Sequence, residues 1–225
     1  MSAARLFLLS GGSGGIGAAV ASQLADLGYR PVIGYNRNAE AAGEIARKTG
    51  GMPLALDLTS PESIEAAVSQ LAAPDTELAG VLLAGSPPPA LHAYGKVPAE
   101  EMAHQWQVNV AGPQLLTAGL VRNCFRRARQ GTVIGVLTKA MGAEGQGASS
   151  GMAAYVIAKY GLAGVLAALA AEFAWLKVRS VRPGYTETHM LTAFDPRFLE
   201  LQREKEPFQT AEQVASEIVR EITEA

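Results

Sequence analysis

The sequence predicts a single α/β domain built on a doubly wound parallel sheet. Three observations lead to this prediction. Short apolar segments alternate with amphipathic helical segments, which is the order of consecutive strand–helix units. A glycine-rich turn follows the first apolar segment directly. No repeat, low-complexity tract or linker interrupts the chain, so residues 1–225 are assigned to one domain.

The first half of the chain is expected to form four strands and three helices. Residues 6–9 are uniformly apolar, as in a strand that is buried on both faces of a parallel sheet. The helix after them places Val20, Leu24 and Leu27 on one face and ends at Gly28. The later elements are a strand at 31–35, a helix at 39–48, a strand at 53–56, a helix that begins at Ser60-Pro61-Glu62 and a strand at 78–84.

The second half continues this alternation. A helix that begins after Pro98 is expected to run to about Arg127, with a bend near Gly112-Pro113 because proline lacks a backbone donor. It is followed by a strand at 132–137, a glycine-rich loop at 142–151, a long alanine-rich helix, a strand at 178–181 and a last helix from Thr210. Short links between such units imply right-handed crossovers and place the ligand cleft at the carboxyl ends of the strands.

Composition and charge exclude several kinds of partner. The formal net charge of -2 provides no basic field for nucleic acid. The single cysteine, Cys124, excludes an internal disulfide. The three histidines, His92, His104 and His189, have no metal-ligand spacing, so no metal site is expected.

The sequence predicts neither a targeting segment nor a membrane span. The apolar residues 6–9 end at Ser10, which makes them too short for a signal sequence. The most apolar helix, around 162–175, is interrupted by Glu172 and is predicted to fall short of a membrane span. A cytoplasmic protein is therefore predicted.

A glycine-rich turn at residues 10–17 lies between the first strand and the first helix. Glycine lets the backbone turn sharply and lets a phosphate approach main-chain N–H groups, while the helix N-terminus favours negative charge. The strand–turn–helix context favours a pyrophosphate site over a merely flexible turn.

Tyr155 and Lys159 are four residues apart and therefore share one face of the long helix. A free phenol has a pKa of about 10 and is a poor proton donor or acceptor near neutral pH. A neighbouring ammonium stabilises the phenolate and lowers that pKa, which makes the pair a candidate for acid–base chemistry.

The order of these motifs resembles the short-chain dehydrogenase/reductase family, with a pattern closest to its 3-oxoacyl-carrier-protein reductases. Gly11, Gly15 and Gly17 match the family's glycine pattern, and Asp57 matches its adenine-contacting aspartate. The resemblance covers about residues 5–190 and implies a Rossmann-like fold. Cofactor contacts are then expected from Ser10, Gly11, Gly15, Ile16, Gly17, Arg37, Asp57, Leu58, Ala84, Gly85, Tyr155, Lys159, Pro183, Gly184, Thr186 and Thr188.

Cofactor choice depends on the end of the second strand. A carboxylate there would bind the ribose 2′-hydroxyl of NAD and repel a 2′-phosphate. This chain has Tyr35-Asn36-Arg37 instead, with no carboxylate and with a cation that suits phosphate. NADPH is therefore predicted over NADH, the alternative being that Arg37 is only a solvated surface charge.

The resemblance also implies catalytic roles for four residues. Tyr155 would protonate the developing alkoxide, Lys159 would tune the phenol and bind the ribose, and Asn109 would hold a helix bulge and a water of the proton relay. The family's carbonyl-binding serine falls at Thr138, about four residues farther from Tyr155 than is usual. A serine in the glycine-rich loop is the alternative for this role, namely Ser149 or Ser150.

The predicted activity is the NADPH-dependent reduction of a carbonyl, with a 3-oxoacyl thioester as a candidate substrate. The rival interpretation is a non-catalytic dinucleotide-binding regulator or assembly subunit of the same fold. That rival draws on three departures from the family: Leu82 and Leu83 replace the two asparagines, Thr138 replaces a serine, and the seventh strand is not expected.

The resemblance further suggests partners. Arg129 matches, and Lys177 lies beside, positions at which the family docks an acidic carrier protein; the alternative is that cations offset a helix C-terminus. The family's seventh strand is not expected, so a tetramer is in doubt and a homodimer through Trp106 and residues 163–173 is predicted. An apolar lid over the site, or ordinary packing of a short helix, is expected from Met190, Leu191, Phe194, Phe198 and Leu199.

Overall fold

A computed structural model describes residues 5–74, 76–143 and 147–224 of the chain. Its centre is a parallel sheet of six strands in the order β3-β2-β1-β4-β5-β6. The strands are β1 (Leu6–Ser10), β2 (Arg30–Tyr35), β3 (Met52–Ala55), β4 (Leu78–Leu83), β5 (Thr132–Val136) and β6 (Lys177–Val181). Each predicted strand agrees with the observed one to within one residue at either end. The doubly wound α/β fold is thus confirmed.

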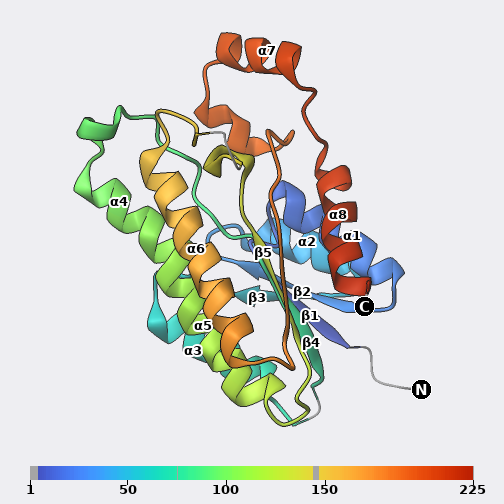
Figure 1. Cartoon of the computed structure of the whole chain (residues 1–225). Helices are drawn as coiled ribbons and strands as arrows, with labels where there is room; N and C mark the ends of the chain where they lie inside the picture. Colours follow the sequence, from blue (N-terminus) through green and yellow to red (C-terminus); the bar gives the residue numbers. More distant parts are fainter. Residues whose placement is uncertain (1–4, 75, 144–146, 225) are drawn as a thin grey trace.

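Helices cover both faces of the sheet (Figure 1). The α-helices are α1 (Gly15–Asp26), α2 (Ala39–Thr49), α3 (Pro61–Leu71), α4 (Ala99–Trp106), α5 (Gly112–Leu120), α6 (Ala153–Glu172), α7 (Pro196–Lys205) and α8 (Ala211–Thr223). Helices α1, α2 and α8 pack in one core layer, and α3, α5 and α6 pack in the other. Along the chain, α1 and α2 cover one face of the sheet, α3, α5 and α6 then cover the other, and α8 returns to the first, as in a doubly wound sheet.

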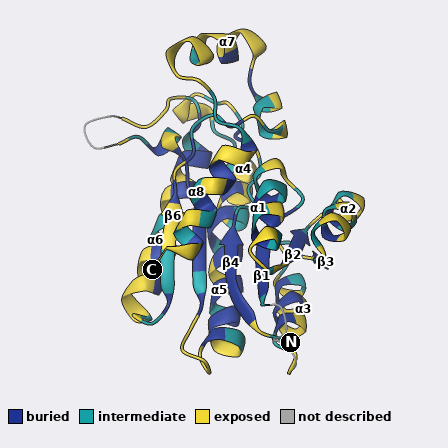
Figure 2. Cartoon of the chain, turned by 90° about the vertical axis from the view of Figure 1, so that its right-hand side faces the viewer, coloured by how far each residue is buried: buried dark blue, intermediate teal, exposed yellow. Residues whose placement is uncertain are grey.

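The central strands are buried on both faces, which explains their uniformly apolar sequences (Figure 2). Successive side chains of a strand point to opposite faces. Phe7 and Leu9 accordingly pack with α1 and α8, whereas Leu6 and Leu8 pack with α3, α5 and α6.

The helix predicted from Pro98 to about Arg127 is interrupted by two π-helical turns. They are η2 (Gln107–Ala111) and η3 (Val121–Phe125), with α5 between them. Pro113 lies in the first turn of α5, directly after η2. A π turn therefore lies beside the predicted bend at Gly112-Pro113, and its altered bonding pattern accommodates the donor that proline lacks.

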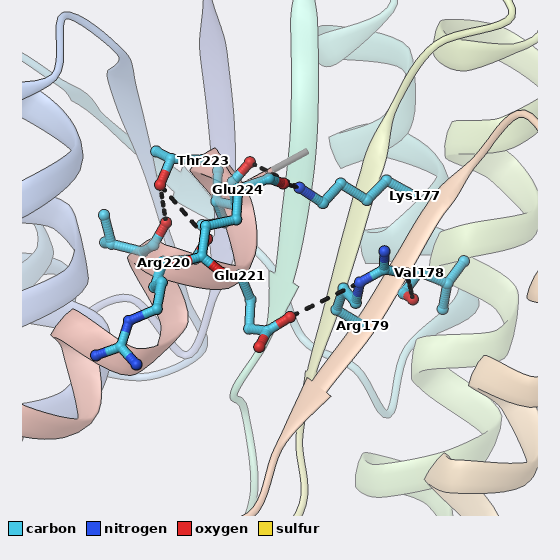
Figure 3. Close-up of polar contacts among 9 residues, drawn as sticks. Lys177, Val178, Arg179, Arg220, Glu221, Thr223 and Glu224 are labelled. Atoms are coloured by element: carbon cyan, nitrogen blue, oxygen red, sulfur yellow. Dashed lines mark hydrogen bonds and ion pairs between the residues drawn. The ribbon is translucent and has the colours of Figure 1, made fainter.

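The C-terminal helix α8 ends against the edge strand β6 (Figure 3). The Lys177 ammonium donates to the carbonyls of Ile222 and Glu224, and Arg179 pairs with Glu221 at 3.7 Å. Among the described residues the sheet ends at β6, as predicted. Charged side chains on this edge discourage pairing with a further strand.

The prediction about the most apolar helix was wrong in its bounds. Helix α6 begins at Ala153, so its 20 residues are long and apolar enough to cross a membrane by length and composition alone. The buried side chains Leu162 and Leu166 pack this helix into the core beside the sheet. Hydropathy alone does not separate a core helix of this kind from a membrane span.

Candidate active site

A large cavity opens at the carboxyl ends of the strands. Its volume is about 1110 Å³, which exceeds that of an ordinary drug-sized pocket. Every predicted cofactor residue lines it, together with Tyr155, Lys159 and Thr138. Asn109 does not line it and lies behind the cavity wall, with no exposed surface. The fold thus brings residues from the whole chain to one edge of the sheet.

The glycine turn makes a close approach of backbone to backbone. Gly11 has a φ of +75°, and a Cβ on it would lie 2.7 Å from the amide nitrogen of Gly85. A Cβ on Gly17 would lie 2.4 Å from the carbonyl oxygen of Gly11. Helix α1 begins after Gly14 without a side-chain cap, so its first N–H groups remain available to an anion. This geometry suits a pyrophosphate.

The end of β2 offers one cation to the cavity. Arg37 lines the cavity, is exposed, and has no ion-pair partner among the described residues. Asn38 is already used, because its side chain accepts from the amide of Ala41 at 3.0 Å and caps α2. Arg37 is therefore a cation at this end of β2 that is free, among the described residues, to meet a phosphate.

Asp57 follows β3 in an Asx-type turn. One carboxylate oxygen accepts from the amide and the hydroxyl of Thr59, at 2.8 and 2.7 Å. The neighbouring Leu58 is buried, and a Cβ on Gly85 would lie 3.2 Å from its methyl carbon. Asp57 is thus held rigidly beside the β1 and β4 loops, where an adenine ring would lie if the glycine turn binds the pyrophosphate.

Tyr155 and Lys159 meet in a nearly dry environment. The Lys159 ammonium is 2 % exposed, donates to the carbonyl of Val136 at 2.9 Å, and lies 5.5 Å from the centroid of the Tyr155 ring. Burial lowers the pKa of Lys159 to about 7. Burial also raises the pKa of Tyr155 to about 12, and hydrogen bonding with the Thr138 side chain opposes this rise. In the protein without cofactor, burial therefore has a larger effect on the pKa of Tyr155 than the neighbouring ammonium, which the sequence suggested would lower it.

Thr138 is the better placed of the candidate hydroxyls. It is buried after β5, lines the cavity together with Tyr155, and its side chain opposes the rise in the pKa of the Tyr155 phenol. Ser149 and Ser150 are exposed, and of the two only Ser149 lines the cavity. Part of the loop between them and β5, residues 144–146, lies outside the described residues. The geometry therefore favours Thr138 as the group that orients a carbonyl oxygen.

The 183–188 segment forms a part of the cavity wall that meets the glycine turn. A Cβ on Gly15 would lie 2.7 Å from the methyl carbon of Thr188, so the Gly15 backbone packs directly against the Thr188 side chain. Thr186 is buried and donates to the carbonyl of Gly184 at 3.2 Å. Pro183 and Gly184 line the same wall.

The segment after Thr188 covers part of the site. The 3-10 helix η5 (His189–Ala193) and helix α7 project beyond the sheet (Figure 2). Met190, Leu191 and Phe194 line the cavity, whereas Leu199 packs in an aromatic cluster with Tyr185. Both sequence-based expectations are partly met, because the segment is at once a cavity wall and a packed helix. It also places Phe198 outside the cavity lining.

Two features of the cavity lining and one residue behind it escaped the sequence reasoning. The proline loop at 86–89 and Lys139 both line the cavity, and Lys139 forms an ion pair with Glu206 next to α7. Gln105 is buried one helical turn before Asn109. The signals were present: the proline loop directly follows β4, Lys139 follows Thr138, and Gln105 shares a helix face with Asn109.

Comparison with known proteins gives a consistent result. The family model for short chain dehydrogenase matches residues 5–197. An uncharacterized oxidoreductase, YmfI of Bacillus subtilis, is 29% identical over 84% of this chain and 78% of its own length. The 3-oxoacyl-[acyl-carrier-protein] reductase FabG of Vibrio cholerae is 32% identical over 85% of this chain and 77% of its own length.

A solved structure shows the same fold. The 3-ketoacyl-(acyl-carrier-protein) reductase of Brucella melitensis, complexed with NADH, superposes with a TM-score of 0.87. It is 21% identical, and the match covers 98% of this chain and 91% of that chain. At this identity the likeness supports the fold, and the site must be argued from its own residues.

Proposed function

The chain belongs to the short-chain dehydrogenase/reductase family and is an NAD(P)-dependent oxidoreductase, and we propose that it reduces a carbonyl to an alcohol with NADPH. The observation that carries this proposal is the convergence of Tyr155, Lys159 and Thr138 on the cavity that the glycine turn also lines. A binding protein would have no need of a phenol and an ammonium buried together at this point.

The residues fit a nicotinamide dinucleotide. The glycine turn and the first N–H groups of α1 suit the pyrophosphate, Asp57 the adenine end, and the 183–188 segment the nicotinamide end. When bound, the cofactor supplies the hydride. The positive charge of its oxidised ring would add to that of Lys159 in lowering the pKa of the Tyr155 phenol.

The protein's own part is to hold and move a proton. Thr138 orients the carbonyl oxygen, and Tyr155 donates its phenolic proton to the alkoxide as negative charge develops there. Lys159 stabilises the resulting phenolate. Oxidation of NADPH against a panel of carbonyl compounds that includes a 3-oxoacyl thioester tests this proposal. NADPH binding without turnover of any of them would favour the non-catalytic alternative.

The preference for NADPH rests on Arg37. Arg37→Ala is expected to raise the dissociation constant for NADPH about 10-fold, because one charge-assisted contact to the 2′-phosphate is lost. NADH affinity should stay within about twofold, since NADH lacks that phosphate. Fluorescence titration measures both constants, with Arg47→Ala on the exposed side of α2 as the matched control. Equal effects on NADPH and NADH would contradict the assignment.

A 3-oxoacyl thioester carried by an acidic protein is the proposed substrate. Four exposed arginines gather at the end of the helix before β5, namely Arg122, Arg126, Arg127 and Arg129. Lys177 contributes less than the sequence suggested, because its ammonium is bound to the carbonyls at the end of α8. The arginine cluster is thus the docking surface that we propose for the carrier.

Arg129→Glu is expected to raise KM for a carrier-bound 3-oxoacyl substrate about fivefold to tenfold, because a contact with an acidic partner becomes a repulsion. KM for the same acyl group on a small thiol should not change. Steady-state kinetics on both substrates measure this, with Arg47→Glu as the control for a charge reversal elsewhere on the surface. If carrier-bound turnover is unaffected, the arginines serve only to offset the partial negative charge at the C-terminus of the helix.

We also propose a cytoplasmic homodimer. Trp106 and Tyr160 are both exposed large side chains, at 46% and 54%, on the packed pair of helices α4 and α6. Exposed aromatic side chains on one helical layer suit an interface between two copies. Sedimentation of the protein with and without Trp106→Glu tests this proposal.

A further inference from the structure

Two fully buried amides lie next to each other behind the cavity. Gln105 at the end of α4 and Asn109 in the π turn η2 both have 0% exposure. Gln105 also reaches the proline loop, which lines the cavity at 86–89. A buried polar side chain is costly to keep unless its hydrogen bonds are made, so the pairing of these groups is informative.

The hydrogen bonds determine which way each amide faces. The Pro88 carbonyl can only accept, and the Gln105 side-chain nitrogen donates to it at 3.0 Å and to the Glu101 carboxylate at 3.1 Å. The Gln105 side-chain oxygen must therefore face Asn109, and it accepts from the Asn109 side-chain nitrogen at 3.0 Å. The second Asn109 proton goes to the backbone carbonyl of Gln105 at 3.1 Å.

One acceptor is left over by this arrangement. Both donors of the Asn109 amide are used, while its side-chain oxygen is buried without a partner among the described residues. Such an atom is usually satisfied by an ordered water or serves a functional purpose. The π turn that carries Asn109 packs on α6, the helix of Tyr155 and Lys159.

We infer that Gln105 is a positioning residue for the proposed reductase. It holds the Asn109 amide so that both donors are engaged and the side-chain oxygen is left as an acceptor for the proton path. It also couples that orientation to the proline loop through Pro88. This inference rests on the proposed function, since the proton path is that of Tyr155 and Lys159. Gln105 itself lies outside the cavity and acts through Asn109.

Gln105→Leu is expected to lower kcat about 10-fold, since one orienting hydrogen bond is lost. KM for the carbonyl and the dissociation constant for NADPH should stay within about twofold, because the cavity wall remains. Gln70→Leu, on the exposed face of α3, is the matched control. Gln105→Met, which keeps the length of the side chain, replaces the leucine variant if that variant does not fold.

A double-mutant cycle and an NMR measurement complete the test. On an Asn109→Ala background, Gln105→Leu should lower kcat little further, because the two residues act as one unit. Additive losses, or a rise in KM with unchanged kcat, would overturn the inference while leaving the reductase intact. The side-chain NH2 of Asn109, one of four asparagines, should exchange slowly with solvent in the wild type and faster in Gln105→Leu.

This second readout does not depend on turnover. If the wild type reduces no carbonyl, the proposed function fails, while the exchange rate of the Asn109 amide still decides whether Gln105 holds it. Unchanged exchange in Gln105→Leu would overturn the inference in either case.

Discussion

Tyr155→Phe is expected to lower carbonyl turnover about 1000-fold while NADPH still binds. The substitution removes the phenolic oxygen and keeps the ring that packs with Met152 and Phe194. A positioned general acid contributes roughly 10²–10⁴-fold to a rate, and Tyr155 is the proposed proton donor. Single-turnover NADPH oxidation measures the chemical step directly.

The control for this variant is Tyr160→Phe. Tyr160 lies on the same helix, is half-exposed, and donates its hydroxyl to the Met141 carbonyl at 2.8 Å. Its loss should leave turnover within about threefold, since one exposed hydrogen bond contributes little. Equal turnover in wild type and Tyr155→Phe would show that the proton comes from elsewhere.

Lys159→Met is expected to lower turnover about 100-fold, because the phenolate formed at Tyr155 loses its neighbouring ammonium. Methionine fills a similar volume and needs no hydrogen bond in place of the one to Val136. The dissociation constant for NADPH should also rise, since the ammonium is proposed to bind the ribose. Lys48→Met on the exposed surface of α2 is the control.

The same variant should change how stability depends on pH. The pKa of Lys159 is lowered by burial from 10.5 to about 7, so between these values the unfolded chain binds more protons than the folded one. The free energy of unfolding should therefore rise with pH over this window, and the rise should be smaller in Lys159→Met. Urea denaturation without added cofactor measures this slope. An equal slope in both proteins would mean that Lys159 keeps its ordinary pKa.

Most of the fold was predictable because local pattern and burial agree. The strands β1 and β4 are buried on both faces, and their sequences are apolar at every position or nearly so. Helix α7 was harder, since Leu199 is its one buried residue and most of its face is charged. Its start was nevertheless encoded, because Asp195 caps the helix and Pro196 occupies its first turn.

The site was predictable to the extent that its residues adjoin strand ends. The glycine turn, Asp57, Thr138 and Pro183 all follow a strand, and the parallel sheet brings such ends together. Gln105 could not be assigned in this way, since its partner Pro88 lies 17 residues away in a loop of irregular structure. A contact of that kind depends on tertiary packing, which no periodicity in the chain reports.

The burial of Tyr155 and Lys159 was equally beyond the sequence. Their spacing shows that they share a helix face, but the direction of a pKa shift depends on how much water that face meets. In the structure the face is nearly dry, and both groups shift toward their neutral forms. The positive charge that the nicotinamide ring gains on oxidation would therefore assist the proposed acid chemistry by lowering the pKa of the Tyr155 phenol.

The most direct test of the central claim uses NADPH that carries deuterium at the hydride position. It is incubated with the wild-type protein and a panel of carbonyl compounds that includes a 3-oxoacyl thioester, and the products are examined by mass spectrometry. A reductase of the proposed kind will place the deuterium on the carbinol carbon of at least one product, one atom for each NADPH consumed. Tight NADPH binding with no deuterium in any product would contradict the account and identify a dinucleotide-binding protein without this chemistry.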